Sequence, residues 1–264
     1  MLDLGLVLPN LSYNYVLSGI QSGLPVILKI GYWKPEVQEE INALKALAGN
    51  ACVKLVDFDI GLGAILQQRI IPGTPLKEMF PSQEEQSIKI MGGVIKDLQS
   101  CAHVDLRNFR HVSSWLDTLK KDWDIPQKYL IKSRELAQLL LSTTKREVLL
   151  HGDLHHENIL LDSNNKWVAI DPKGVIGDPV YEIGAAIRNP IPELLANDDA
   201  EHIIQNRVDS FAELLEFDHK RIFDWAYVQA ALGACWAIEY GLDAEYFIKF
   251  LDIFETIMEN EKEI

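Results

Sequence analysis

The sequence predicts an α+β fold of two lobes, in which a small antiparallel sheet with one helix precedes a larger, mainly helical lobe. Short β-type runs fill residues 1–72, whereas helix-type periodicity dominates from about residue 82 onward. A breaker cluster of two prolines and a glycine at 71–75 separates the two regimes. The chain has 264 residues, 48% of them hydrophobic, which is enough for a sizeable core.

The small lobe is expected to span residues 1–72. Four short apolar runs predict its strands, and one helix-type segment falls between the second run and the third. The strands are expected at Tyr15–Ser18, Pro25–Ile30, Val53–Phe58 and Ala64–Ile71, and the helix at Glu36–Ala48. A short linker is expected at 71–76, and the second lobe at 73–264.

The helical pattern of the second lobe is interrupted once, near residue 160. Two short apolar runs, 158–162 and 166–170, are joined by Ser163-Asn164-Asn165, which are turn-forming residues. This pattern predicts a hairpin. Its open end brings Asn158 close to Asp171.

Asp153, Asn158 and Asp171 have the spacing of a phosphoryl-transfer site. Asp153 and Asn158 are five residues apart in His-Gly-Asp-Leu-His-His-Glu-Asn, and Asp171 follows the expected hairpin. In the protein-kinase signature the first of these residues receives the acceptor hydroxyl, and the other two bind metal. Carboxylate and amide oxygens suit Mg²⁺. We therefore predict ATP as the donor, Asp153 as the base, and Asn158 and Asp171 as Mg²⁺ ligands.

The same segment resembles the aminoglycoside phosphotransferase family, in which glycine replaces the arginine of the protein-kinase loop. The resemblance is to the subgroup of streptomycin 6-phosphotransferases and hydroxyurea resistance kinases. It extends to 26–30, 42–49, 72–76, 170–181 and Arg188-Asn-Pro190. It implies a two-lobed protein-kinase-like fold, ATP in the cleft between the lobes, and a small-molecule acceptor.

Lys29 lies inside the apolar run Val26-Ile-Leu-Lys-Ile-Gly of the small lobe. A buried ammonium group needs a partner, and protein kinases pair such a lysine with a helix glutamate and use it to bind phosphates. A lysine on an edge strand, reaching solvent, is the structural alternative. The family's glutamate precedes an Ala-Leu pair, which selects Glu40, with Glu39 as the second choice.

Two further segments of the small lobe are expected to contact ATP. Where protein kinases have a glycine-rich loop, this chain has residues 9–16, in which Ser12 and Asn14 are the candidate phosphate contacts. The segment 67–71, which leads into Pro72-Gly73, corresponds to the kinase hinge, whose backbone groups bind adenine. We assign Arg69 and Ile71 to it.

Candidates for the acceptor site come from the helical lobe. On the helix expected at 221–240, Trp236 and Glu239 share one face, and an aromatic ring beside a carboxylate suits a cationic sugar. Glu182 is a second acidic candidate. Each acid also has a structural explanation, because Glu239 can simply reach solvent from a core helix and Glu182 can follow a helix start capped by Asp178.

The charge of the chain is uneven. The net charge is −14, and residues 191–264 carry 17 acids against 5 bases, which places −12 of it there. A negative field repels nucleic acid and attracts cations, so we expect a small, hydroxylated, cationic acceptor and no nucleic-acid partner. Solvated faces of acidic helices explain the same charge.

Nothing in the sequence predicts a membrane span. The longest nearly apolar stretch, 226–238, is too short to cross a bilayer, and the start Met1-Leu-Asp-Leu lacks the basic residues of a signal peptide. Three cysteines without metal spacing fit a reducing compartment. We expect a cytoplasmic protein that is a monomer or a weak homodimer.

Three functions compete. The first is an ATP-dependent kinase of a streptomycin-like aminoglycoside, of hydroxyurea or of another hydroxylated metabolite. A protein kinase is expected to have a glycine-rich loop and an Ala-Pro-Glu segment, and the sequence has neither. A non-catalytic nucleotide-binding module tolerates loss of the motif residues, and all are present. His151, His155 and His156 lack zinc-site spacing, and His151 and His155 are expected to brace the loop through backbone hydrogen bonds.

Overall fold

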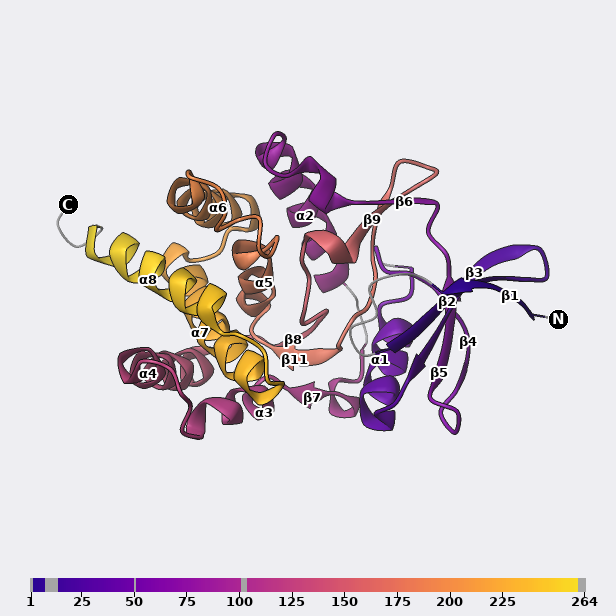
Figure 1. The fold of residues 1–264 in the computed structure, drawn as a ribbon, viewed down its shortest axis with the longest axis horizontal. Helices are drawn as coiled ribbons and strands as arrows, with labels where there is room; N and C mark the ends of the chain where they lie inside the picture. The colour runs from indigo at the N-terminus through magenta and orange to yellow at the C-terminus, as the bar shows by residue number, and fades with distance from the viewer. Residues whose placement is uncertain (1, 8–13, 50, 101–103, 261–264) are drawn as a thin grey trace.

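The computed structural model describes residues 2–7, 14–49, 51–100 and 104–260. Figure 1 shows a small sheet with one helix at one end of the molecule and a group of helices at the other. The N-terminus lies beside the sheet, and the C-terminus lies at the far end of the helices. The predicted α+β class and two-lobed arrangement are confirmed, whereas the exact division at residue 72 stays a prediction.

The small lobe is built on five antiparallel strands in the order β1-β2-β3-β5-β4. The strands are β1 (Leu2–Val7), β2 (Asn14–Gln21), β3 (Leu24–Gly31), β4 (Leu55–Asp59) and β5 (Ala64–Gln68). The four predicted runs correspond to β2 to β5, and β1 was not predicted. Ser22 and Gly23 join β2 to β3 with φ of 53° and 81°, the backbone shape that two-residue hairpin turns require.

One helix, α1 (Lys34–Ala46), packs against the small-lobe sheet at β3, β4 and β5. Its buried residues Val37, Ile41 and Leu44 are spaced by four and three positions, so they form one apolar face. That face fixes the rotation of α1 about its own axis. As a result Glu40 points toward β3, where Lys29 lies.

The helical lobe is organised around α7 (His219–Glu239), which packs against α4, α5, α6 and α8 (Figure 1). The other helices are α2 (Glu84–Gln99), α3 (Ser113–Leu116), α4 (Gln127–Thr143), α5 (Ile183–Arg188), α6 (Ala200–Leu215) and α8 (Glu245–Asn260). Both Trp225 and Leu232 of α7 are fully buried. Within the described ranges, no helix has the length and apolar content needed to cross a membrane.

Two three-stranded sheets lie between the small lobe and the helices. One has the order β10-β9-β6 and the other β7-β11-β8. Their bounds are β6 (Pro72–Pro75), β7 (Arg110–His111), β8 (Val148–Leu150), β9 (Ile159–Asp162), β10 (Trp167–Ala169) and β11 (Val175–Gly177). The predicted hairpin is confirmed as β9 and β10, which pair Trp167 with Leu161.

The segment predicted as a linker at 71–76 forms strand β6, which pairs antiparallel with β9. This differs from the expectation because Pro72, Gly73 and Pro75 were interpreted only as breakers. In the structure β6 is an edge strand of its sheet. An edge strand tolerates proline, because the N–H group that proline lacks can lie on the side without a partner strand. The connection between the lobes is therefore held to the hairpin of the catalytic motif.

Candidate active site

The loop 151–158 follows β8 and is shaped by a glycine at its second position. Gly152 has a φ of +86°, a conformation that favours glycine. A Cβ at this position would lie 2.9 Å from the Trp115 ring and 3.0 Å from Val175, so the loop packs directly on these side chains. The close packing explains why glycine stands where protein kinases have arginine.

His151 braces the loop from inside the protein, as predicted. Its buried ring lies 2.7 Å, through Nε2, from the carbonyl oxygen of Ile170, and its Nδ1 accepts the backbone N–H of Asp153 at 3.3 Å. Burial lowers the pKa of His151 to about 4. The ring is therefore neutral near pH 7 and ties the start of the loop to the end of the hairpin.

Glu182 lies beneath the loop and not in an open acceptor site. Its two carboxylate oxygens accept the backbone N–H groups of His151 at 2.6 Å and Gly152 at 2.9 Å, and the side chain is buried. Burial raises the pKa of Glu182 to about 7, although the two N–H donors oppose the rise. Glu182 was expected to contact the substrate, and it instead accepts two backbone hydrogen bonds that position the loop. Asp178 caps the N–H of Val180, as predicted.

Asp153 presents its carboxylate on the opposite side of the loop, where its side chain is 33% exposed. The nearest ionisable side chains to it are Arg188, with Nη2 at 3.7 Å, and His155, with Nε2 at 3.8 Å. Burial opposes ionisation, but His155, Lys173 and Arg188 together hold the pKa of Asp153 below its ordinary value. Asp153 is therefore an ionised carboxylate, the state that a general base needs.

Asn158 and Asp171 meet at the open end of the β9–β10 hairpin. The N–H of Ile170 donates to the carbonyl of Asn158 at 2.9 Å, which brings the two ends together as predicted. The Asn158 amide nitrogen donates to the Asp153 carbonyl at 2.9 Å, so its oxygen is the atom left to face a metal ion. Asp171 has a φ of +60°, a strained conformation for a residue other than glycine.

Lys29 joins the two lobes at this point. Its ammonium group is 2.6 Å from Glu40 Oε1 and 2.9 Å from Asp171 Oδ1, and the residue is only 4% exposed. Burial opposes the charge, but the two carboxylates raise the pKa of Lys29, and Lys29 in turn lowers that of Asp171. The predicted partner Glu40 is confirmed. Glu39 instead pairs with Arg110 at 2.8 Å.

The donor set at the hairpin fits magnesium. Asp171 supplies a carboxylate that is 37% exposed, and Asn158 supplies an amide oxygen, which are hard ligands of the kind that Mg²⁺ binds together with water and phosphate. Within the described ranges there is no group of three or more His, Cys, Asp and Glu side chains that could hold a metal ion.

The proposed ATP contacts of the small lobe are only partly described. Ser12 lies outside the described residues, and Asn14 is the first residue of β2, paired with Gly31 of β3. The backbone N–H of Arg69 donates to the Pro25 carbonyl at 3.1 Å, so this donor is already used within the small lobe. Ile71 is exposed ahead of β6. The assignments of Arg69 and Ile71 to the hinge stay predictions. For Arg69, only the backbone carbonyl remains to bind adenine.

The face of α7 expected to hold a substrate is mostly core. Trp225 is fully buried and donates from Nε1 to Asp178 at 2.8 Å, because α7 is surrounded by other helices. Trp236 is half-buried and meets Trp115 edge to face, with ring centroids 5.9 Å apart. Glu239 is exposed and pairs with Lys121 at 2.9 Å. Of the two substrate candidates Trp236 and Glu239, only Trp236 is connected to the loop 151–158, through its contact with Trp115.

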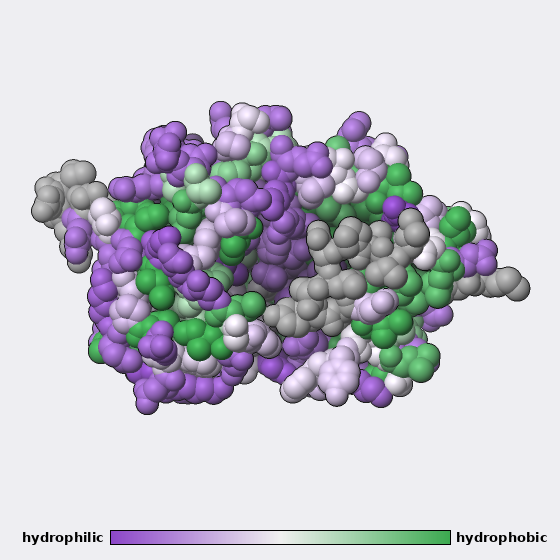
Figure 2. Space-filling view, viewed as in Figure 1, coloured by the Kyte–Doolittle hydropathy of each residue, from purple (hydrophilic) through white to green (hydrophobic). Residues whose placement is uncertain are grey.

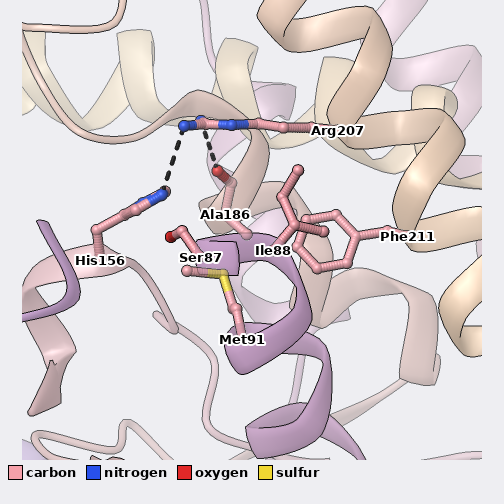
Figure 3. A pocket seen from close by; sticks show the side chains of 7 residues that line it. All are labelled: Ser87, Ile88, Met91, His156, Ala186, Arg207 and Phe211. Atoms are coloured by element: carbon pink, nitrogen blue, oxygen red, sulfur yellow. Dashed lines mark hydrogen bonds between the residues drawn. The ribbon is translucent and has the colours of Figure 1, made fainter. Parts of the chain in front are cut away.

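A buried arginine that the sequence gave no reason to select supports the loop from behind (Figure 3). Arg207 of α6 is 1% exposed, and its guanidinium group donates to the carbonyl oxygens of Ala186, Ile187 and Asn189. Its Nη2 is 3.4 Å from His156 Nε2, and its Nε is 2.5 Å from Glu84. One side chain thus connects α2, α5 and the loop.

The gap beside Arg207 is too narrow to hold a ligand. It is lined by Ser87, Ile88, Met91, His156, Ala186, Arg207 and Phe211, as Figure 3 shows, and leaves no room for a water molecule. Ser87 Oγ and His156 Nδ1 are buried there without a hydrogen-bond partner among the described residues. The gap is therefore part of the packing that supports the loop. A hydrophilic recess lies elsewhere, between the two lobes, on the face that Figure 2 shows.

Comparison with known proteins agrees with this geometry. The family model for aminoglycoside/hydroxyurea antibiotic resistance kinases matches residues 5–241. The chain belongs to this family. The family resemblance seen in the motif is therefore confirmed, and the protein is an enzyme of the phosphotransferase type.

Relatives within and around the family are distant. The streptomycin 6-kinase of Streptomyces griseus is 26% identical over 231 residues, which cover 84% of this chain and 74% of the relative. The hydroxyurea phosphotransferase of Kitasatospora aureofaciens is 26% identical over 225 residues, covering 83% of this chain and 64% of the relative.

Solved structures share the fold. A thermostable mutant of the aminoglycoside phosphotransferase APH(4)-Ia, in ternary complex with ADP and hygromycin B, has a TM-score of 0.71 at 15% identity and covers 96% of this chain and 93% of its own. The choline kinase LicA from Streptococcus pneumoniae has a TM-score of 0.69 at 16% identity, with coverage of 96% and 93%. Two structures with different acceptors thus share one scaffold.

Proposed function

We propose that this protein is an ATP-dependent kinase that transfers the γ-phosphoryl group to a hydroxyl of a small molecule. The observation that carries the proposal is the contact of Lys29 with both Glu40 and Asp171, beside Asp153 and Asn158. These residues come from both lobes, and together they form the set that phosphoryl transfer requires. A module that had lost catalysis has no need to keep every member in place.

Each residue has a distinct part in the proposed reaction. Lys29 holds the α- and β-phosphates of ATP, and Glu40 keeps its ammonium group in place. Asn158 and Asp171 hold Mg²⁺, which when bound offsets the negative charge of the phosphates. Asp153 accepts a hydrogen bond from the acceptor hydroxyl, orients it, and takes its proton as the new P–O bond forms.

The acceptors to test first are those named for the relatives, streptomycin and hydroxyurea. Streptomycin is the larger, cationic candidate that the acidic second lobe favours, because residues 191–264 carry 17 acids against 5 bases. Hydroxyurea is small and uncharged. Arg188, with Nη2 3.7 Å from Asp153 Oδ1, favours this second class, because it places a positive charge beside the carboxylate that would receive the acceptor hydroxyl.

A coupled ATP-turnover assay with each acceptor, followed by mass spectrometry of the product, tests the proposal. Asp153→Asn should lower kcat by roughly 10²–10⁴-fold, because it removes the base, and should leave ATP binding intact. Asp97→Asn, an exposed change on α2, is the matched control and should keep the wild-type rate. Full phosphotransfer by the Asp153→Asn variant would show that the base is assigned to the wrong residue.

A further inference from the structure

We propose that Arg188 selects the acceptor. The selected molecules carry a carbonyl, hydroxyl or anionic oxygen beside the reacting hydroxyl, and not an ammonium or guanidinium group. The inference rests on the proposed kinase activity and concerns the chemistry of the acceptor at Asp153. Arg188 is the last residue of α5, and its side chain is 12% exposed on the side of Asp153.

Arg188 and Asp153 lie side by side without a direct hydrogen bond between them. Arg188 Nη2 is 3.7 Å from Asp153 Oδ1, which is longer than a direct hydrogen bond. Both groups therefore keep hydrogen-bonding capacity for a third molecule. An acceptor whose hydroxyl donates to Asp153 and whose neighbouring oxygen accepts from Arg188 uses both at once, in the two-point manner that suits a guanidinium group.

Arg188 is held in this position by residues that have no part in transfer. Its Nη1 donates to Gln229 Oε1 at 2.8 Å, and Gln229 Nε2 in turn donates to the Tyr181 carbonyl at 2.5 Å. A Cβ at Gly184 would lie 2.5 Å from the Gln229 amide, so the glycine makes room for it. The Tyr246 hydroxyl donates to the Arg188 carbonyl at 2.6 Å. The guanidinium group is thus fixed before any acceptor binds.

The two acids that the sequence suggested for a cationic acceptor, Glu182 and Glu239, already have partners in the structure. Glu182 accepts two backbone N–H groups under the loop, and Glu239 pairs with Lys121 at 2.9 Å. Asp178 is bonded to Arg221 and Trp225. Close to the reacting hydroxyl, the local charge therefore comes from Asp153 and the cations beside it. The net charge of the whole chain acts over longer distances and attracts cations without placing them here.

Hydroxyurea and N-hydroxyguanidine form a matched pair of probes. They share the N–OH group and nearly the same shape, but the carbonyl oxygen of the first is replaced in the second by a guanidinium-type nitrogen that carries a proton at pH 7. The kcat/KM of the wild type should be at least roughly tenfold higher for hydroxyurea than for N-hydroxyguanidine. In the complex with N-hydroxyguanidine the positive charge of the probe would lie beside that of Arg188. Arg188→Gln should erase or invert this ratio.

Two variants control for folding. Arg188→Lys keeps the charge and should keep the preference for hydroxyurea, although with a higher KM. Arg107→Gln makes the same chemical change at an exposed arginine that pairs only with Asp105, and it should leave both kcat/KM values unchanged. An unaltered ratio in Arg188→Gln would overturn the proposal, as would a wild-type preference for N-hydroxyguanidine. An equal fall in kcat for both probes would assign Arg188 to the transferred phosphoryl group instead, and would overturn the selectivity role.

Binding separates this proposal from the proposed function. If the wild type phosphorylates neither probe nor any other acceptor, the proposed kinase activity fails. The affinity of the two probes for the enzyme with a non-hydrolysable ATP analogue and Mg²⁺, measured by calorimetry, still decides the role of Arg188. Tighter binding of hydroxyurea that depends on Arg188 supports it, and equal or reversed affinities overturn it.

Discussion

The back and the front of the loop 151–158 differ in how their side chains are used. We call His151, His156 and Glu182 the back of the loop and Asp153, Asn158 and Asp171 its front. The back is buried and bonded to backbone groups or to Arg207. The front is partly exposed, and Asp171 contacts Lys29 of the small lobe.

The difference shows how one short segment supports both folding and chemistry. The back fixes the path of the chain through contacts that water does not reach, where bonds to backbone groups are worth more than at the surface. The side-chain oxygens of the front can then bind ligands while the path of the loop stays fixed. Mutations at the back should therefore change stability first, and mutations at the front should change rate first.

Breaking the front at Asp171 should give the largest effect on rate. Asp171→Asn removes a metal-ligating carboxylate, so kcat should fall by roughly 10²–10³-fold in the ATP-turnover assay. Glu40 still pairs with Lys29 at 2.6 Å, and the melting temperature should therefore stay close to that of the wild type. A large loss of stability with little loss of rate would contradict the division between front and back.

Breaking the back at Arg207 should give the largest effect on stability. Arg207→Met leaves Glu84 without its partner and three carbonyl oxygens without their donor, which should lower the free energy of unfolding by about 3–5 kcal/mol in urea titrations. Adding Glu84→Gln should recover part of the loss. Arg107→Met at an exposed site is the control, with an expected change below about 0.5 kcal/mol.

Glu182 gives the back a pH dependence. Its pKa is raised from 4.5 to about 7 in the folded protein, so the folded state holds a proton that the unfolded chain releases. This contribution to stability is full below about pH 4.5 and is lost as the pH rises to about 7, by up to about 3 kcal/mol. Subtracting the pH profile of Glu182→Gln from that of the wild type isolates it. A difference that grows with pH would contradict the assignment.

The ion pair of Arg110 and Glu39 belongs to neither face and should matter least. It joins β7 to α1 at 2.8 Å, and about half of the Arg110 side chain is exposed. Arg110→Gln should lower the free energy of unfolding by less than about 1 kcal/mol. The small effect should shrink further when the urea titration is repeated at high salt. A loss as large as that of Arg207→Met would show that the lobes depend on this contact.

The sequence was most informative where function depends on local spacing. Asn158 and Asp171 are joined by a short hairpin, so motif spacing and turn residues were sufficient to bring them together. Glu40 lies on the helix that follows the Lys29 strand, and the family resemblance selected it over Glu39. Strands β2 to β5 of the small lobe followed from their apolar runs, whereas β1 did not. Strands of two to four residues, such as β7 and β8, are too short to show a period.

The contacts of Arg188, Arg207 and Glu182 could not be predicted in the same way. Each joins elements far apart in the sequence, such as α6 with α2 for Arg207, and no local pattern encodes such a contact. The Arg188-Asn-Pro190 motif was the one available signal, and it gave no indication of the partner. On α7 the aromatic spacing was correct, but a helix buried on all sides gives no clue to which face meets a ligand.

The central position of α7 has a consequence for local unfolding. Residues from Ile222 to Cys235 are buried, so their amide protons reach solvent only when the whole lobe opens, and they should be among the slowest to exchange with deuterium. Gln229 of the same helix holds both Arg188 and the Tyr181 carbonyl, one residue before Glu182. We therefore expect the hydrogen bonds of Gln229 to Arg188 and to the Tyr181 carbonyl to break only when the lobe opens as a whole, and not when its surface frays.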